Sequence, residues 1–267
     1  MRAKALGVLL RHHWWRHRVP LFAIATGLAL FELLLTRIAP APGETGWMSM
    51  IFAALPPELL ALVGDQVAAG SPAGFLAIGY GHPFVLLLLS AWTVRVSSGA
   101  LAGEIGQGTM DLLAARPARR RVHVAAAFMA VALGLAVLLG AAWTGTALGL
   151  ATRPLGLSGT RLLPVAAMAW LLFTAFGAVG VLVSAVRRDG GSAIGWLSGI
   201  LATSFVLEYL ARLWKPIAAL RPLSLFACYA PPRIIDAGPD AIDVARLVGV
   251  AVVALVAAVI WFNRRDL

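Results

Sequence analysis

The feature that most constrains this chain is a series of six long apolar segments. We place them at about 20–38, 82–103, 122–150, 162–186, 192–211 and 245–262. About 20 apolar residues in helical form cross a bilayer. Backbone groups inside lipid must be hydrogen-bonded within the protein, which favours helices here. The sequence therefore predicts an all-α, polytopic membrane protein whose residues 1–267 form a single transmembrane domain.

The composition excludes the two alternatives to a membrane protein. Hydrophobic residues make up 60% of the chain and charged residues only 13%, about half the charge of a soluble domain. A soluble domain of this length cannot hide so much apolar surface from water, and a disordered chain is far more polar. Cys228 is the only cysteine, so neither an intrachain disulfide nor a cysteine-based zinc site is expected.

The segment before the first span predicts a helix lying in the membrane interface. Within residues 1–18, leucines and Trp14 recur at helical spacing, and most of the basic residues fall elsewhere around the helix. We expect Pro20 to turn the chain sharply into the bilayer. His13 and His17 are four residues apart, but no carboxylate or cysteine adjoins them. We therefore predict no metal site and expect both histidines among lipid headgroups.

The basic residues predict the orientation of the chain. With the N-terminus in the cytoplasm, the inner segments are 1–19, 104–121, 187–191 and 263–267, and with Arg95 they carry most of the 22 basic residues. Acids balance the remaining basic residues on the outer side. The net charge of +10 is therefore read as an orientation signal that places both termini in the cytoplasm, and not as a nucleic-acid-binding surface.

Two long loops are expected to contain structure of their own. The first follows span one and includes Pro56-Pro57-Glu58, which is typical of the start of a short amphipathic helix. The second, 212–244, is rich in proline and acidic residues.

Several kinds of catalytic site are disfavoured by the sequence. Neither lysine, Lys4 or Lys215, lies in a Gly-Lys-Ser/Thr motif, so ATP hydrolysis through a P-loop is excluded. Gly156-Leu157-Ser158-Gly159 matches the pattern of an intramembrane serine protease, but every histidine precedes Ser158 and the motif lies between spans. We predict no catalytic residues in this chain.

Ionisable and small residues inside the spans are the remaining candidates for function. Arg95 has no local partner, so it either lines a transport path or reaches the inner interface. Glu208 and Arg212, four residues apart, are expected either to form an ion pair or to anchor the chain at the interface near the outer surface. Gly191, Gly195 and Gly199 repeat every four residues and predict either packing within the chain or a dimer seam. Gly145 and Gly149 show the same spacing.

The most informative segment is the predicted cytoplasmic loop 104–120. It resembles the pattern E-x-x-x-G-T-[LM]-[DE]-L-L-[LA]-A-x-P-x-x-R of type-2 permeases of ATP-binding-cassette (ABC) transporters, such as antibiotic-export and NosY-like subunits. Gly106 departs from the pattern, which commonly has an acidic residue there. The tail Arg264-Arg265-Asp266-Leu267 is also similar to the ends of such permeases. The residues that match the loop pattern are Glu104, Gly108, Thr109, Asp111, Leu112, Leu113, Pro117 and Arg120.

This resemblance implies a division of labour between subunits. Two copies of a separate ATPase would bind ATP and Mg²⁺, and this chain would bind no cofactor. Loop 104–120 would be the coupling helix that docks on the ATPase, and residues 1–18 would be the connecting helix. A second permease copy, identical or different, would complete an exporter in the bacterial cytoplasmic membrane. The alternative is a stand-alone secondary transporter driven by an ion gradient.

Overall fold

The computed structural model describes residues 2–40, 54, 71–108 and 120–264, and these ranges are helical with no strand. Six helical segments within them are long and apolar enough to span a membrane. The predicted all-α polytopic fold is confirmed. The spans are Leu6–Ile38, Pro72–Gly106, Arg120–Thr152, Gly159–Val186, Gly190–Leu213 and Ala241–Arg264.

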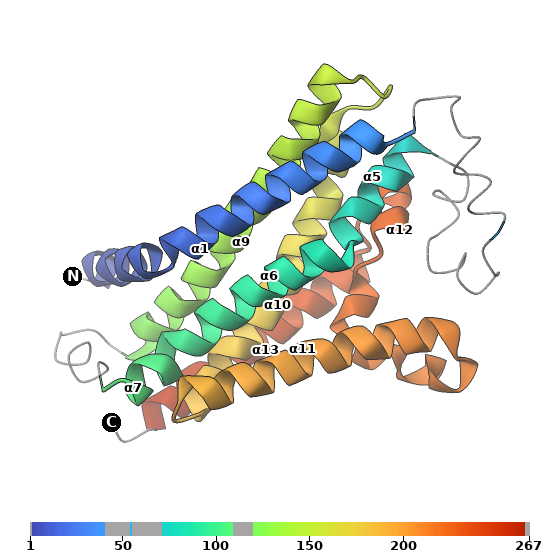
Figure 1. Cartoon of the computed structure of the whole chain (residues 1–267). Coiled ribbons are helices and arrows are strands. Elements are labelled where there is room, and N and C mark those ends of the chain that lie inside the picture. The colour runs from blue at the N-terminus through green and yellow to red at the C-terminus, as the bar shows by residue number, and fades with distance from the viewer. Residues whose placement is uncertain (1, 41–53, 55–70, 109–119, 265–267) are drawn as a thin grey trace.

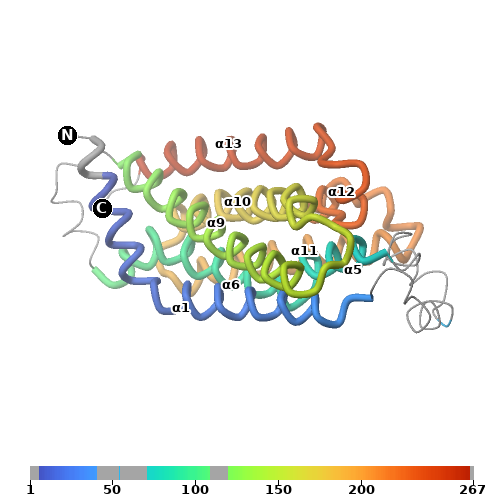
Figure 2. Tube along the Cα trace, turned by 90° about the horizontal axis from the view of Figure 1, so that it is seen from above, coloured from blue at the N-terminus to red at the C-terminus, as the bar shows by residue number. Residues whose placement is uncertain are grey.

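The spans pack as a bundle with α10 at its centre (Figures 1 and 2). α10 (Leu163–Val186) contacts α6 (Pro83–Ser98), α9 (Arg120–Thr152), α11 (Gly190–Leu213) and α13 (Ala241–Arg264). It fully buries Phe173 and Phe176. The beginning of α1 (Arg2–Ile38) and the end of α13 lie at the same end of the bundle as α7 (Glu104–Gly106) (Figure 1).

The structure differs from the sequence-based expectation at Pro20. α1 continues through Pro20 as one helix and bends along its length instead of breaking (Figure 2). An internal proline removes one backbone hydrogen bond and kinks a helix, but flanking turns can hold it together. At 1.5 Å per residue, α1 is roughly 55 Å long, well above the thickness of a hydrocarbon core.

Glycines allow α1 and α9 to pack closely. A Cβ atom added at Gly145 would overlap the backbone of Ala29, and one added at Gly149 would overlap the side chain of Thr36. Close contact between two helices requires small residues at such crossing points. Gly145 and Gly149 therefore serve packing within the chain.

The second span begins earlier than residue 82. α5 (Pro72–Gly81) precedes α6, and His82 separates them with an extended ψ of 137°. Pro83 cannot continue the hydrogen bonding of the preceding helix, and it sits at the first turn of the next one. The span then passes through a short π-helical turn, η1 (Gly99–Gly103), into α7. Pro56-Pro57-Glu58 lies outside the described residues.

The second long loop has structure of its own, as expected, and this structure consists of short helices. It contains two 3₁₀ segments, η3 (Lys215–Leu223) and η4 (Leu225–Cys228), followed by α12 (Pro231–Ala237). Another 3₁₀ turn, η2 (Gly159–Leu162), leads into α10. The loop lies at the end of the bundle opposite α7 (Figure 1).

Candidate functional site

A groove runs between α6 and α11, and we call it the α6–α11 groove. We call the end of the bundle at α7 the inner end and the end at η3 the outer end, after the predicted orientation. The inner part of the groove has a volume of about 610 Å³ and is lined mainly by apolar side chains, with Ser90, Arg95 and Ser198 as its polar groups. A second cavity of about 260 Å³ extends it towards Glu208 and Arg212. The two cavities form one groove because they share part of their lining, namely Pro83, Leu86, Phe205 and Phe226.

The length of the groove is comparable to the thickness of a membrane. Its lining on α11 runs from Ile194 to Arg212, which is roughly 27 Å at 1.5 Å per residue. A bilayer core is about 30 Å thick. The groove thus follows α11 over a length close to the thickness of a bilayer core.

Arg95 is exposed on the wall of this groove. The sequence left two positions open for Arg95, the lining of a path or the inner interface, and the structure places its side chain in the lining of a cavity. Among the described residues, no acidic side chain forms an ion pair with Arg95.

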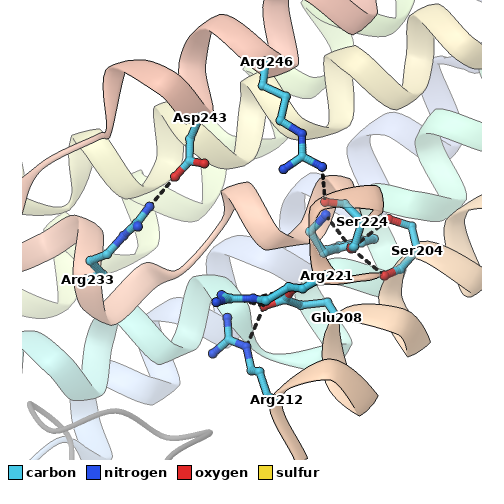
Figure 3. Close-up of polar contacts among 9 residues, drawn as sticks. Ser204, Glu208, Arg212, Arg221, Ser224, Arg233, Asp243 and Arg246 are labelled. Carbon is cyan, nitrogen blue, oxygen red and sulfur yellow. Dashed lines mark hydrogen bonds and ion pairs between the residues drawn. The ribbon is translucent and has the colours of Figure 1, made fainter. Parts of the chain in front are cut away.

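An ion-pair cluster borders the outer end of the groove (Figure 3). Glu208 is only 7% exposed, and its Oε1 lies 2.6 Å from Nε of Arg212 and 3.1 Å from Nη2 of Arg221. The i, i+4 pair agrees with the sequence-based expectation. Arg221 was not anticipated as a partner of Glu208, because it lies in η3, thirteen residues after Glu208 in the chain.

Serine hydroxyls hold the outer loop against α11 (Figure 3). The Ser224 hydroxyl donates to the Ser204 carbonyl at 2.7 Å, and the Leu225 amide donates to Ser204 Oγ at 3.0 Å. Arg246 on α13 donates to the Ser224 carbonyl at 3.0 Å. These contacts join α11, the outer loop and α13 into one unit at this end of the bundle.

Cys228 lies buried at the end of η4. Burial raises the pKa of its thiol to about 11. Since the thiolate is the reactive form, this cysteine is an inert part of the outer loop at neutral pH.

A third cavity, of about 950 Å³, borders the opposite side of α11 and is lined by Gly195 and Gly199. A Cβ atom added at either glycine would meet nothing within 4 Å, and one added at Gly191 would meet only Oδ1 of Asp189, at 3.3 Å. Unlike Gly145 and Gly149, these glycines are not used for packing within the described part of the chain.

At the inner end, Glu104 links the second span to α1. Glu104 is 3% exposed and forms an ion pair with Arg16. His12 Nε2 lies 3.6 Å from Glu104 Oε1, and Arg16 also donates to Oε1 of Gln107 at 3.2 Å. The first residue of the predicted coupling segment is therefore anchored to the basic part of α1.

The other end of the coupling segment is anchored to α13. Arg120 donates to the carbonyl groups of Phe262 and Asn263 at 3.0 and 3.1 Å. Gly108 has a φ of +69°, a left-handed conformation that glycine adopts without strain. The other predicted coupling residues lie outside the described residues: Thr109, Asp111, Leu112, Leu113 and Pro117.

Ser184 on α10 supports the π-helical turn between Arg95 and Glu104. Its hydroxyl oxygen accepts from the amides of Leu101 and Ala102 at 3.2 and 2.9 Å, and it donates to the Ser98 carbonyl at 3.0 Å. Isolated π turns are frequent at functional sites. No sequence motif marked Ser184, because its partners are more than 80 residues away in the chain.

The histidines of α1 differ from their expected position. His13 and His17 are 8% and 7% exposed and line an internal cavity together with Trp92. The rings of His17 and Trp92 meet edge to face with centroids 6.2 Å apart. They therefore pack against α6 and do not lie among headgroups. Within the described ranges, no group of three or more His, Cys, Asp or Glu side chains is arranged to hold a metal ion.

Comparison with known proteins identifies the family. The model of the family described as "ABC-2 family transporter protein" matches residues 59–267, which is more than half of the chain. The search of curated proteins finds no match. The family match agrees with the six apolar helices and with the groove that follows α6 and α11 across the bundle. The chain therefore belongs to the ABC-2 transporter family and is a multi-pass membrane permease of an ABC transporter.

Proposed function

We propose that this chain is the membrane subunit of an ABC exporter in the bacterial cytoplasmic membrane, with both termini in the cytoplasm. Two copies of a separate ATPase supply ATP hydrolysis and bind ATP and Mg²⁺. Two permease copies enclose the path of the substrate. The permease itself binds no nucleotide or nucleic acid and carries no catalytic residue.

The observation that carries this proposal is the direct connection between the groove and the coupling segment. Arg95 in the groove wall and Glu104 at the start of the segment belong to one continuous helical stretch through α6, η1 and α7. A push on the coupling segment therefore acts on the groove wall through the eight residues of helix between Arg95 and Glu104. Such a motion transports a molecule only if the inward and outward states bind it differently.

The two anchors of the coupling segment define where that push is delivered. Glu104 connects it to Arg16 on α1, and Arg120 connects it to the end of α13. ATPase closure is thereby transmitted to the first, second and last spans together. We assign the contact with the ATPase to residues 104–120, assisted by the connecting part of α1.

The second permease copy is proposed to pack along α11. Gly195 and Gly199 leave that helix face without side-chain bulk, and Trp196 and Ile200, which line the same cavity, are exposed at 55% and 36%. Small residues flanked by large apolar ones allow two helices to approach closely within lipid.

Copurification tests the proposal. The permease is expressed with its candidate ATPase, and the amount of ATPase retained is measured for the native chain, Asp111→Lys and Glu104→Lys. We expect both reversals to reduce retention, Asp111→Lys at the docking surface and Glu104→Lys by displacing Arg16. Asp236→Lys, an exposed acid on α12, is the matched control and should retain the ATPase.

The same material separates the exporter from a secondary transporter. An exporter moves its substrate only when ATP is supplied and the ATPase is present. Transport by the purified permease alone along an ion gradient would overturn the proposed function.

A further inference from the structure

The charge distribution along the α6–α11 groove differs between its two ends. At the outer end, the buried carboxylate of Glu208 pairs with both Arg212 and Arg221, so each of these guanidinium groups already has an acidic partner within the protein. At the inner end, Arg95 lies on the wall with only the hydroxyls of Ser90 and Ser198 as polar neighbours in the lining. A cation in an apolar groove is unfavourable without a counterion.

The surroundings of Arg95 on α1 do not supply that counterion. His17 lies within electrostatic range of Arg95, and an imidazole carries no negative charge. The nearby acid is Glu104, and it is held by Arg16 and approached by His12. Within the described residues, the inner end of the groove therefore has an excess of positive charge.

The groove is open towards the lipid. Leu87 and Ile194, which line its inner part on α6 and α11, are 66% and 45% exposed. Apolar chains can therefore enter from the side without crossing a polar surface. A volume of about 610 Å³ lies within the range of small-molecule binding sites.

We propose that the α6–α11 groove binds a membrane lipid with an acidic headgroup, with the headgroup at Arg95 and the acyl chains along the apolar wall. This inference rests on the proposed function and adds the substrate class to it. Anionic lipids are present in the cytoplasmic leaflet, which is the side of Arg95. A guanidinium group binds phosphate through charge-assisted, bidentate hydrogen bonds.

The asymmetry of the groove also gives the transport a direction. A lipid phosphate finds at Arg95 a guanidinium group without an acidic partner among the described residues, whereas at the outer end it would have to compete with the Glu208 carboxylate for Arg212 and Arg221. Binding is therefore favoured at the inner end and release at the outer end. This order is the one an exporter requires.

The first experiment measures which lipid the protein retains. The full permease with its ATPase is purified, incubated with equal amounts of phosphatidylglycerol and phosphatidylcholine, and examined by native mass spectrometry. We expect the native complex to retain phosphatidylglycerol about tenfold over phosphatidylcholine, as one lost charge-assisted contact changes affinity by about this factor. Arg95→Gln should reduce the preference to near parity, and Arg95→Lys should keep most of it.

Arg264→Gln is the matched control, because Arg264 is an exposed arginine at the inner end of α13 outside the groove lining. It should retain the native preference. Equal retention of both lipids by the native complex would overturn the inference, as would an unchanged preference in Arg95→Gln. If Arg95→Gln fails to fold, equal retention of both lipids by the native complex still overturns the inference, as does a preference that Arg95→Lys abolishes.

The second experiment separates this inference from the proposed function. ATP-dependent movement of labelled phosphatidylglycerol and phosphatidylcholine is followed in vesicles that contain both lipids. Preferential movement of phosphatidylglycerol supports the inference. Equal movement of both lipids contradicts the inference but leaves an ATP-driven permease. Cross-links that place a second copy of the chain inside the groove would also overturn it.

Discussion

Arg16 on α1 and Glu104 at the start of α7 form an ion pair between residues 88 positions apart in the chain. Glu104 is almost completely buried, whereas the Arg16 side chain is 34% exposed. The carboxylate depends on this partner more than the guanidinium does, because a buried charge without a partner is strongly unfavourable. The pair joins the connecting part of α1 to the helix that leads into the groove.

We predict that Arg16→Ala destabilises the permease by roughly 2–3 kcal/mol, because Glu104 loses its main partner in a buried position. It should also reduce the stimulation of ATP hydrolysis by substrate. Thermal unfolding in detergent and ATPase assays of the complex measure the two effects. The double variant Arg16→Glu/Glu104→Arg restores the pair and should recover part of both. Equal defects in the single and double variants would argue against a direct pairing.

A second prediction concerns Ser184 and the π-helical turn. Ser184→Ala removes the hydroxyl that donates to the Ser98 carbonyl and accepts from the amides of Leu101 and Ala102. The loss of these buried hydrogen bonds should destabilise the protein by about 1–3 kcal/mol. Because the turn lies between the groove and the coupling segment, the coupling of ATP hydrolysis to transport should fall more than the affinity of the permease for its ATPase does. The ratio of transport to ATP hydrolysis measures this effect. Thr144→Ala, which removes an exposed hydroxyl bonded within its own helix, is the control and should leave the ratio unchanged.

The fold was predictable from the sequence because burial in lipid imposes long apolar helices. The contacts between helices were not, because periodicity reports only which residues share a face of one helix. Arg16 with Glu104, and Ser184 with the backbone of Ser98, join residues more than 80 positions apart. The local pair Glu208–Arg212 was predictable from its i, i+4 spacing. Its second partner, Arg221, depends on how the outer loop folds back.

A third prediction concerns two sets of glycines that share a four-residue spacing. Gly145 and Gly149 are in close contact with α1, whereas Gly195 and Gly199 face open space. Gly145→Ala should lower stability by roughly 1–3 kcal/mol, since its Cβ overlaps the backbone of Ala29. Gly195→Ala and Gly199→Ala should leave unfolding of the single chain unchanged, as open space surrounds both positions. Larger substitutions, Gly195→Leu and Gly199→Leu, should weaken association of two permease copies, measured by light scattering in detergent. Unchanged association would exclude these glycines from the seam.

The last prediction uses Cys228 as a reporter of the outer loop. Burial raises the pKa of its thiol to about 11, so the folded protein should react very slowly with maleimide at pH 7. Labelling should accelerate about tenfold with each pH unit, as the thiolate fraction does, and level off only near pH 11. In the unfolded chain the thiol ionises near pH 8.5, so the thiol's contribution to stability is fully present below that pH and is lost as the pH rises through the folded pKa. Mass spectrometry measures the labelling rate, with Asp236→Cys in a Cys228→Ser background as the exposed control. Labelling of Cys228 at pH 7 as fast as the control would contradict a closed outer loop.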